Sequence, residues 1–166
     1  MIRKPGHAPG FFMPAACRDS AMPEQSNRPT RDAYAWFCDM PTRWMDNDVY
    51  GHVNNVAYYS YFDTAANRYL IEAGGLDIHT DPVVGFVVSS NCRYHEPIAF
   101  PDPLEVGLRV DRLGNRSVTY GLAIFVAGAE TASADGEFVH VFVDRASGRS
   151  TAVPEKLARA LGELCR

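Results

Sequence analysis

The stretch "RWMDNDVYGHVNNVAYYSYFDTAANRYL", residues 43–70, holds the turn and the helix that decide the fold. Two acids, a glycine, a histidine and several asparagines are packed into positions 46–55. From about Asn55 onward, apolar side chains recur at three- and four-residue spacing, which is typical of a helix. Gly74-Gly75 ends this pattern, because glycine accepts the left-handed conformation found at helix ends. The sequence therefore predicts one long helix over about residues 55–73.

Period-two alternation of apolar and polar residues predicts strands on both sides of this helix. The run before the helix ends at Pro41, which cannot donate to a ladder, so that strand is expected at a sheet edge. The turn Gly114-Asn115 joins two alternating runs into a hairpin. The expected strands cover about 34–40, 83–97, 104–110, 118–126 and 136–144, and a short helix over 154–164 closes the chain.

The order of elements is strand, long helix and then four strands, without the alternation of a doubly wound fold. This order predicts an α+β protein with a mainly antiparallel sheet. The long helix is apolar on more than one side, so we expect a curved sheet to wrap around it. Residues 1–32 are rich in proline and lack the apolar core of a signal peptide, so we expect a flexible N-terminal leader before a single domain over 33–166.

Composition excludes several classes of function. The 166 residues carry a net charge of -4 and no continuous basic stripe, so nucleic acid and anionic membrane partners have no electrostatic support. No apolar run approaches the roughly 20 residues that span a bilayer. The four cysteines lie far apart without a C-x-x-C pair, and no two histidines have metal-site spacing, so we expect incidental thiols, no metal and a cytoplasmic location.

Positions 46–55 allow two interpretations from physical chemistry alone. Asp and Asn are favoured helix caps, so Asn54 or Asn55 could simply cap the helix. A helix start also leaves backbone N–H groups unpaired and carries a partial positive charge, which can hold a carbonyl oxygen as it becomes negative. Asp48, placed just before the helix, could then attack that carbonyl or activate water, and Gly51 would allow the close backbone approach that brings the two together.

The stretch "WMDNDVYGHVNNVAYYSYFDTA" resembles the signature of the 4-hydroxybenzoyl-CoA thioesterase family of hotdog-fold proteins, in which a D-x-D-x-x-G turn precedes a long helix. The order of elements over about residues 33–145 is also similar to that family's fold. The resemblance implies a hotdog fold, with a curved antiparallel sheet wrapped around one long central helix. It further implies an acyl-CoA thioesterase, which releases a free carboxylic acid and CoA. CoA is part of the substrate, so no cofactor is expected.

Carried over by position, the resemblance makes Asp48 the catalytic carboxylate, as nucleophile or general base. It makes the backbone N–H of Asn55 the group that polarises the thioester carbonyl, with Asp46 in support. The H-V-N-N segment also resembles plant acyl-ACP thioesterases, in which an acid four positions before a histidine is catalytic. Asp48 and His52 keep that spacing, but Tyr50 stands where those enzymes have asparagine. His52 is expected either to orient water or substrate, or to stabilise the turn.

The resemblance also places Arg116 at a position that meets CoA in relatives, with Arg149 and Lys156 as weaker candidates. It implies a homodimer, or a dimer of dimers, with the site where subunits meet. The acyl pocket would be lined partly by helix residues such as Tyr58, Tyr59 and Phe62. Three rival functions remain open: an acyl-ACP thioesterase, a non-catalytic binder of acyl thioesters, and a hotdog dehydratase, which the absence of its His-led motif disfavours. No nucleotide-binding glycine motif and no G-x-S-x-G stretch occurs.

Overall fold

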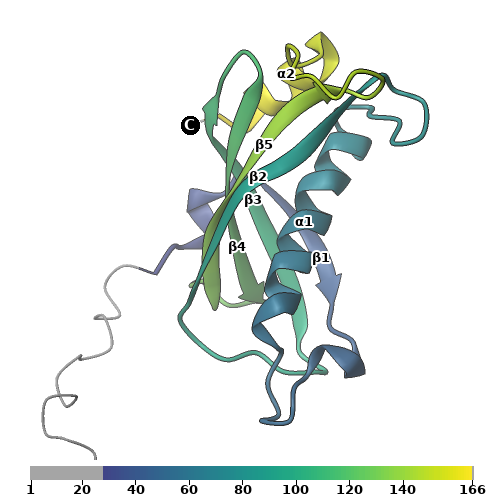
Figure 1. The fold of residues 1–166 in the computed structure, drawn as a ribbon. Coiled ribbons are helices and arrows are strands. Elements are labelled where there is room, and N and C mark those ends of the chain that lie inside the picture. Colours follow the sequence, from purple (N-terminus) through teal and green to yellow (C-terminus); the bar gives the residue numbers. More distant parts are fainter. Residues whose placement is uncertain (1–27, 166) are drawn as a thin grey trace, which may run out of the picture.

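A computed structural model describes residues 28–165 of the chain. A five-stranded antiparallel sheet curves around the long helix α1, and the shorter helix α2 packs at one end of the sheet (Figure 1). This is the hotdog arrangement that the resemblance implies. The elements are the 3-10 turns Arg31–Ala33 and Trp44–Asp46, strands β1 (Trp36–Pro41), β2 (Val83–Tyr94), β3 (Pro103–Leu113), β4 (Ser117–Val126) and β5 (Ala134–Asp144), and helices α1 (Asn55–Glu72) and α2 (Glu155–Glu163).

Helix α1 begins and ends close to the predicted residues. Beyond its last turn, the amide of Leu76 donates to the carbonyl of Leu70, and Gly75 takes a φ of +63°. Glycine adopts this left-handed conformation without strain, so the Gly74-Gly75 pair ends the helix as expected. The face of α1 toward the sheet is buried and consists of Ala57, Tyr58, Tyr61, Phe62, Ala65, Ala66, Tyr69 and Leu70. No helix within residues 28–165 has the length and hydropathy that crossing a bilayer requires.

The strand order across the sheet is β1-β3-β4-β5-β2. Strand β1 therefore lies at one edge, as Pro41 predicts, and β3 and β4 form the expected hairpin. The predicted alternation in β5 is also confirmed, because Phe138 on its inner face packs against Phe62 of α1, with ring centroids 5.8 Å apart. These pairings define the inner face of the sheet as the face toward α1.

Strand β2 forms the other edge of the sheet, although it contains one of the most apolar runs of the chain, V-V-G-F-V-V at residues 83–88. Its side chains are unusually exposed for such residues: Phe86 is 58% exposed, Val87 43% and Val88 60%. The sequence predicts this strand but not its position. An apolar edge strand with unpaired backbone groups is a surface on which another chain can pair.

The N-terminal segment that the structure describes packs on the outer face of the sheet. Of the expected leader, residues 1–27 lie outside the described part of the chain. Residues 28–32 belong to the folded unit: the Arg28 guanidinium donates to the carbonyl of Ala132 at 2.8 and 3.0 Å, and Arg31 forms an ion pair with Glu105. Gly107 leaves room for this cover, because a Cβ there would lie 2.9 Å from the ring of Tyr34.

His140 lies on the inner face of β5 and is 1% exposed. Neither of its ring nitrogens has a hydrogen-bond partner among the described residues, and the same holds for the hydroxyl of its neighbour Tyr120, whose ring centroid is 5.1 Å away. Gly85 of β2 makes room for the imidazole, since a Cβ there would lie 3.0 Å from Nδ1. Burial without a partner disfavours the charged form and lowers the pKa of His140 to about 4.

This buried imidazole predicts a loss of stability on acidification. Between pH 6.5 and pH 4 the unfolded chain binds a proton at His140 that the native chain does not, so the free energy of unfolding falls as pH decreases through that window, by about 3 kcal/mol. We expect His140→Leu to remove this dependence. Urea unfolding of both proteins at several pH values measures it, and parallel profiles for the two would contradict the assignment.

Candidate active site

The turn before α1 is a tight loop closed by its own backbone. The amide of Asp48 donates to the carbonyl of His52 at 2.8 Å, and Asn47 and Val53 form a β-bridge across the loop. The Asp48 carboxylate accepts from the amide of Tyr50 at 2.8 Å, which orients its side chain. Gly51 has a φ of +85°, and a Cβ there would meet nothing within 4 Å. The expectation of a close backbone approach at Gly51 is therefore wrong, and glycine is needed for its dihedral angle.

Two hydrogen bonds fasten the loop to the segment between β2 and β3. The amide of Val53 donates to the carbonyl of Ile98 at 2.8 Å, and the amide of Phe100 donates to Oδ1 of Asn47 at 3.0 Å. The segment between β2 and β3 thus holds the turn in place beside the start of α1. A carboxylate on such a turn needs little reorganisation before it acts, because its backbone is already fixed.

Asp46 is the anchor of the turn, and it is only 4% exposed. Its carboxylate accepts hydrogen bonds from the amide and guanidinium of Arg43, at 2.7 to 3.0 Å, and from the hydroxyl of Tyr61 at 2.7 Å. Burial opposes ionisation of Asp46, but these hydrogen bonds outweigh it and lower the pKa of the carboxyl. The carbonyl of Asp46 also accepts from the amide of Asn54 at 2.8 Å, so one residue connects the turn, α1 and the helix cap.

The start of α1 divides its two tasks between adjacent asparagines. Asn54 is the N-cap: its side chain accepts from the amide of Val56 at 3.1 Å, and its carbonyl accepts from the amide of Ala57 at 2.9 Å. The amide of Asn55 has no acceptor within residues 28–165. Capping and electrophilic activation are therefore compatible, because the cap leaves one amide at the positive end of the helix available.

The remaining residues of the turn are exposed. The imidazole of His52 forms no hydrogen bond with the described residues; the residue stabilises the turn through its carbonyl. Tyr50, the residue that departs from the acyl-ACP pattern, is 83% exposed at the tip of the turn, and its amide donates a hydrogen bond to the carboxylate of Asp48. Trp44 and Phe100 form an exposed aromatic pair beside the turn, with ring centroids 5.8 Å apart.

Aromatic side chains line the sheet beside the first two turns of α1. Of the residues expected to line an acyl pocket, Tyr58 and Phe62 are buried in the core, while Tyr59 is half-buried and stacks on Phe138 with centroids 6.3 Å apart. Tyr94, at the end of β2, contacts both the ring of Tyr58 and the carbonyl of Asn55. Sequence reasoning missed Tyr94, because no local pattern connects a strand end with a helix start 39 positions away.

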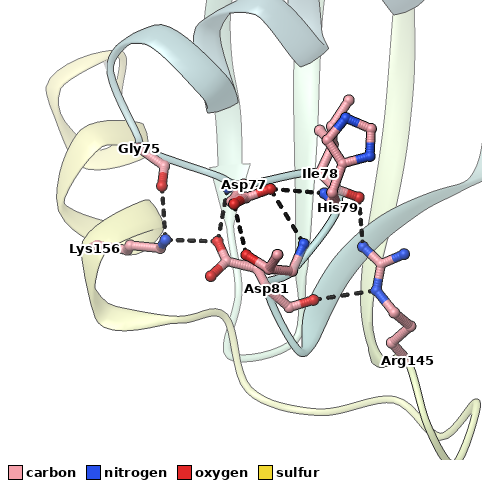
Figure 2. A network of polar contacts seen from close by, with 8 residues as sticks. Gly75, Asp77, Ile78, His79, Asp81, Arg145 and Lys156 are labelled. Carbon is pink, nitrogen blue, oxygen red and sulfur yellow. Dashed lines mark hydrogen bonds and ion pairs between the residues drawn. The ribbon is translucent and has the colours of Figure 1, made fainter.

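The cations expected to meet CoA lie at the other end of the molecule. Arg116 sits in the β3–β4 hairpin and contacts only the hydroxyl of Ser150, at 3.4 Å, among the described side chains. Strand β3 starts beside Phe100 and runs for 11 residues, so Arg116 lies roughly 30 Å from the turn of its own subunit. The Lys156 ammonium is occupied, since it binds Asp81 at 2.6 Å and the carbonyl of Gly75 at 2.7 Å (Figure 2).

One cavity of about 560 Å³ opens at the β1 edge of the sheet. None of Asp48, His52 or Asn55 lines this cavity. Glu105, one of the carboxylates that do line it, already forms an ion pair with Arg31. It therefore gives no support to a substrate site there. The lining residues are Asp39 to Thr42, Pro101 to Glu105 and Ala127.

Comparison with known proteins identifies relatives of this arrangement. A family model described as the thioesterase-like superfamily matches residues 42–161. The PA5185 protein of Pseudomonas aeruginosa is 58% identical, with a TM-score of 0.82 over 83% of this chain and 96% of that chain. PA2801 of the same organism, described as a proposed thioesterase, is 31% identical, with a TM-score of 0.69 over 75% and 96%. No curated protein matches the chain.

A more distant structure shares only the fold. The 1,4-dihydroxy-2-naphthoyl-CoA thioesterase from Synechocystis is 17% identical, with a TM-score of 0.69 over 77% of this chain and 96% of that chain. The match covers the curved sheet and the central helix together.

Proposed function

The chain belongs to the thioesterase-like superfamily, and from this membership, which supports hydrolysis of an acyl thioester in general, we propose that it is an acyl-CoA thioesterase of the 4-hydroxybenzoyl-CoA thioesterase type. The observation that carries the proposal is a carboxylate, Asp48, on a turn fastened to a helix start whose Asn55 amide has no acceptor among the described residues. The products are a free carboxylic acid and CoA, and the reaction needs no cofactor.

Each group has a defined task in the proposed reaction. The Asn55 amide donates to the thioester carbonyl oxygen, and the partial positive charge of the helix start stabilises the negative charge that develops there. In one route the Asp48 carboxylate removes a proton from the water that attacks the carbonyl carbon, the carbon–sulfur bond breaks, and the proton passes to the CoA thiolate. In the other route the carboxylate attacks the carbonyl carbon itself and CoA leaves; water then hydrolyses the acyl–Asp48 anhydride, which releases the acid and restores the carboxylate. His52 is proposed to orient water or substrate, since the residue is exposed on the turn and its carbonyl accepts a hydrogen bond from the amide of Asp48.

The apolar edge of β2 supports assembly into a homodimer. Two copies that pair antiparallel through this strand would cover Phe86, Val87 and Val88 and satisfy the unpaired backbone groups. A twofold axis at this edge brings the helix start of one subunit toward the hairpin end of the other. Arg116 of the partner subunit, and not the residue of the same chain, would then be placed to meet the CoA phosphates.

The residues around the turn favour CoA over an acyl-carrier protein as the carrier. An enzyme that acts on an acyl-carrier protein needs a basic patch near its active site on which the acidic carrier can dock. Arg43 is the one lysine or arginine between residues 43 and 56, and its guanidinium forms an ion pair with Asp46, so this segment supplies no basic patch. The thiols of Cys38, Cys92 and Cys165 are free, which fits the proposed cytoplasmic location.

A panel of acyl-CoA thioesters tests the proposal directly. We expect release of free thiol from at least one aromatic, short-chain or long-chain acyl-CoA, at a rate that saturates with substrate. Matched acyl-ACP substrates serve as the comparison for the carrier. Turnover of acyl-ACP alone would refute the CoA assignment, and silence across both sets would refute hydrolysis.

A further inference from the structure

Tyr94 lies at the end of the exposed strand β2, yet its ring is held in a defined place. It packs edge to face against the ring of Tyr58, with centroids 4.9 Å apart and an interplanar angle of 85°. Tyr58 belongs to the first turns of α1 and is only 3% exposed, so it forms a fixed support. Tyr94 itself remains 46% exposed, so part of the residue is accessible beside the helix start.

The hydroxyl of Tyr94 points at Asn55, the residue whose amide has no acceptor among the described residues. It donates to the Asn55 carbonyl at an O···O distance of 3.4 Å. Hydroxyl donors in proteins usually lie about 2.7–2.8 Å from their acceptors, so the bond to Asn55 is weak. The same hydroxyl also interacts with the side chains of Cys92 and Tyr59. A weakly held donor is readily turned toward a stronger acceptor, and a carbonyl oxygen that is becoming negative is such an acceptor.

The surroundings of Tyr94 keep its hydroxyl protonated. Desolvation and the neighbouring thiol of Cys92 raise the pKa of Tyr94 above its ordinary value. Burial also raises the pKa of Cys92, to about 11, so the thiol does not compete as an anion near neutral pH. Tyr94 is thus a neutral hydrogen-bond donor, which can stabilise an oxyanion without giving up its proton.

We propose that Tyr94 is a further catalytic residue, whose hydroxyl donates a second hydrogen bond to the thioester carbonyl oxygen beside the Asn55 amide. This inference rests on the proposed thioesterase function. The packing against Tyr58 holds the ring in place. Without substrate, the hydroxyl donates to the carbonyl of Asn55. When the thioester binds, its carbonyl oxygen replaces the Asn55 carbonyl as the acceptor. The proton stays on the phenol throughout, so Tyr94 exchanges no proton with the water or with CoA in either route.

Replacement of Tyr94 by phenylalanine tests this role, because the ring and its contact with Tyr58 are retained. We expect kcat on the best acyl-CoA to fall by about 10-fold or more, with KM within about threefold of the wild-type value, since a donor to the oxyanion acts mainly in the transition state. Tyr50→Phe is the matched control: it removes another exposed hydroxyl near the site, and its kinetics should stay unchanged.

A second measurement separates catalysis from structure. An S-alkyl thioether of CoA, in which a CH2 group replaces the carbonyl, should bind the wild-type protein and Tyr94→Phe with equal affinity, and both proteins should have the same melting temperature. An unchanged kcat for Tyr94→Phe in an active wild-type background overturns the inference while the thioesterase assignment stands. A loss of thioether affinity would also overturn it, because it would show a binding or structural role. Absence of wild-type turnover on every thioester overturns both.

Discussion

Replacing Asp48 by asparagine is expected to lower kcat on the best acyl-CoA by about 10²-fold or more, while the protein stays folded. The side-chain oxygen of asparagine can still accept the hydrogen bond from the amide of Tyr50, so the turn keeps its shape. What is lost is the negative charge that, in the proposed reaction, attacks the carbonyl or accepts a proton from water. Steady-state kinetics together with circular dichroism measure the two effects separately.

The control for this prediction is Asp39→Asn. Asp39 is an exposed carboxylate on β1, and its removal changes the net charge by the same amount. We expect Asp39→Asn to keep wild-type kcat. If Asp48→Asn kept full activity on the best substrate, another group would have to be the base or nucleophile, and Asp48 would be only a turn residue.

Replacing Asp46 by alanine should have the largest effect on stability. It removes the acceptor of the Arg43 amide, of the Arg43 guanidinium and of the Tyr61 hydroxyl, and the buried hydroxyl is left without a partner. We expect the free energy of unfolding to fall by about 3 kcal/mol, in the range found when buried charged hydrogen bonds are broken. We also expect kcat to fall, because the turn that carries Asp48 loses its anchor.

A graded series makes the Asp46 prediction specific. Tyr61→Phe removes one of these hydrogen bonds and should lower the free energy of unfolding by about 1 kcal/mol. Asp39→Ala should have no more than a small effect, because Asp39 is exposed. Urea unfolding of the three variants gives the order. Equal stabilities for Asp46→Ala and Asp39→Ala would show that the network around Asp46 does not stabilise the fold.

Much of the fold follows from local patterns in the sequence. The spacing of apolar residues, the asparagines before the helix and Gly74-Gly75 after it determine α1 to within a residue or two. The alternation in residues 104–126 determines the β3–β4 hairpin, since register and turn are neighbours in the chain. Such elements are predictable because the groups that define them lie within a few positions of one another.

Local patterns in the sequence do not predict contacts between residues that lie far apart in the chain. Nε2 of His95 lies 2.6 Å from Oδ1 of Asp135, which the pairing of β2 with β5 brings alongside although 40 positions separate the two residues. The hydrogen bond from the hydroxyl of Tyr61 to the carboxylate of Asp46 also depends on how the turn folds back against the helix. The exposed edge of β2 likewise depends on strand order, which apolar content does not determine.

The candidate site divides in the same way. The positions of Asp48 and Asn55 follow from the motif and the helix start, and Asn54 takes the capping role that the sequence left open between two residues. Arg116 was expected near the site, but the length of β3 separates it from the turn of its own chain. Arg116 follows the last residue of β3, whereas the turn lies beside the first, so the two are at opposite ends of this strand within one chain.

The apolar edge of β2 also has a consequence for the newly made chain. That chain presents a strand of 12 residues with Phe86, Val87 and Val88 uncovered, and an extended segment of another chain can add to it. If the proposed dimer forms through this strand, its pairing would compete with aggregation during synthesis, and the outcome would depend on how quickly two copies meet. The edge that would hold the dimer together would then also be a site where aggregation can begin.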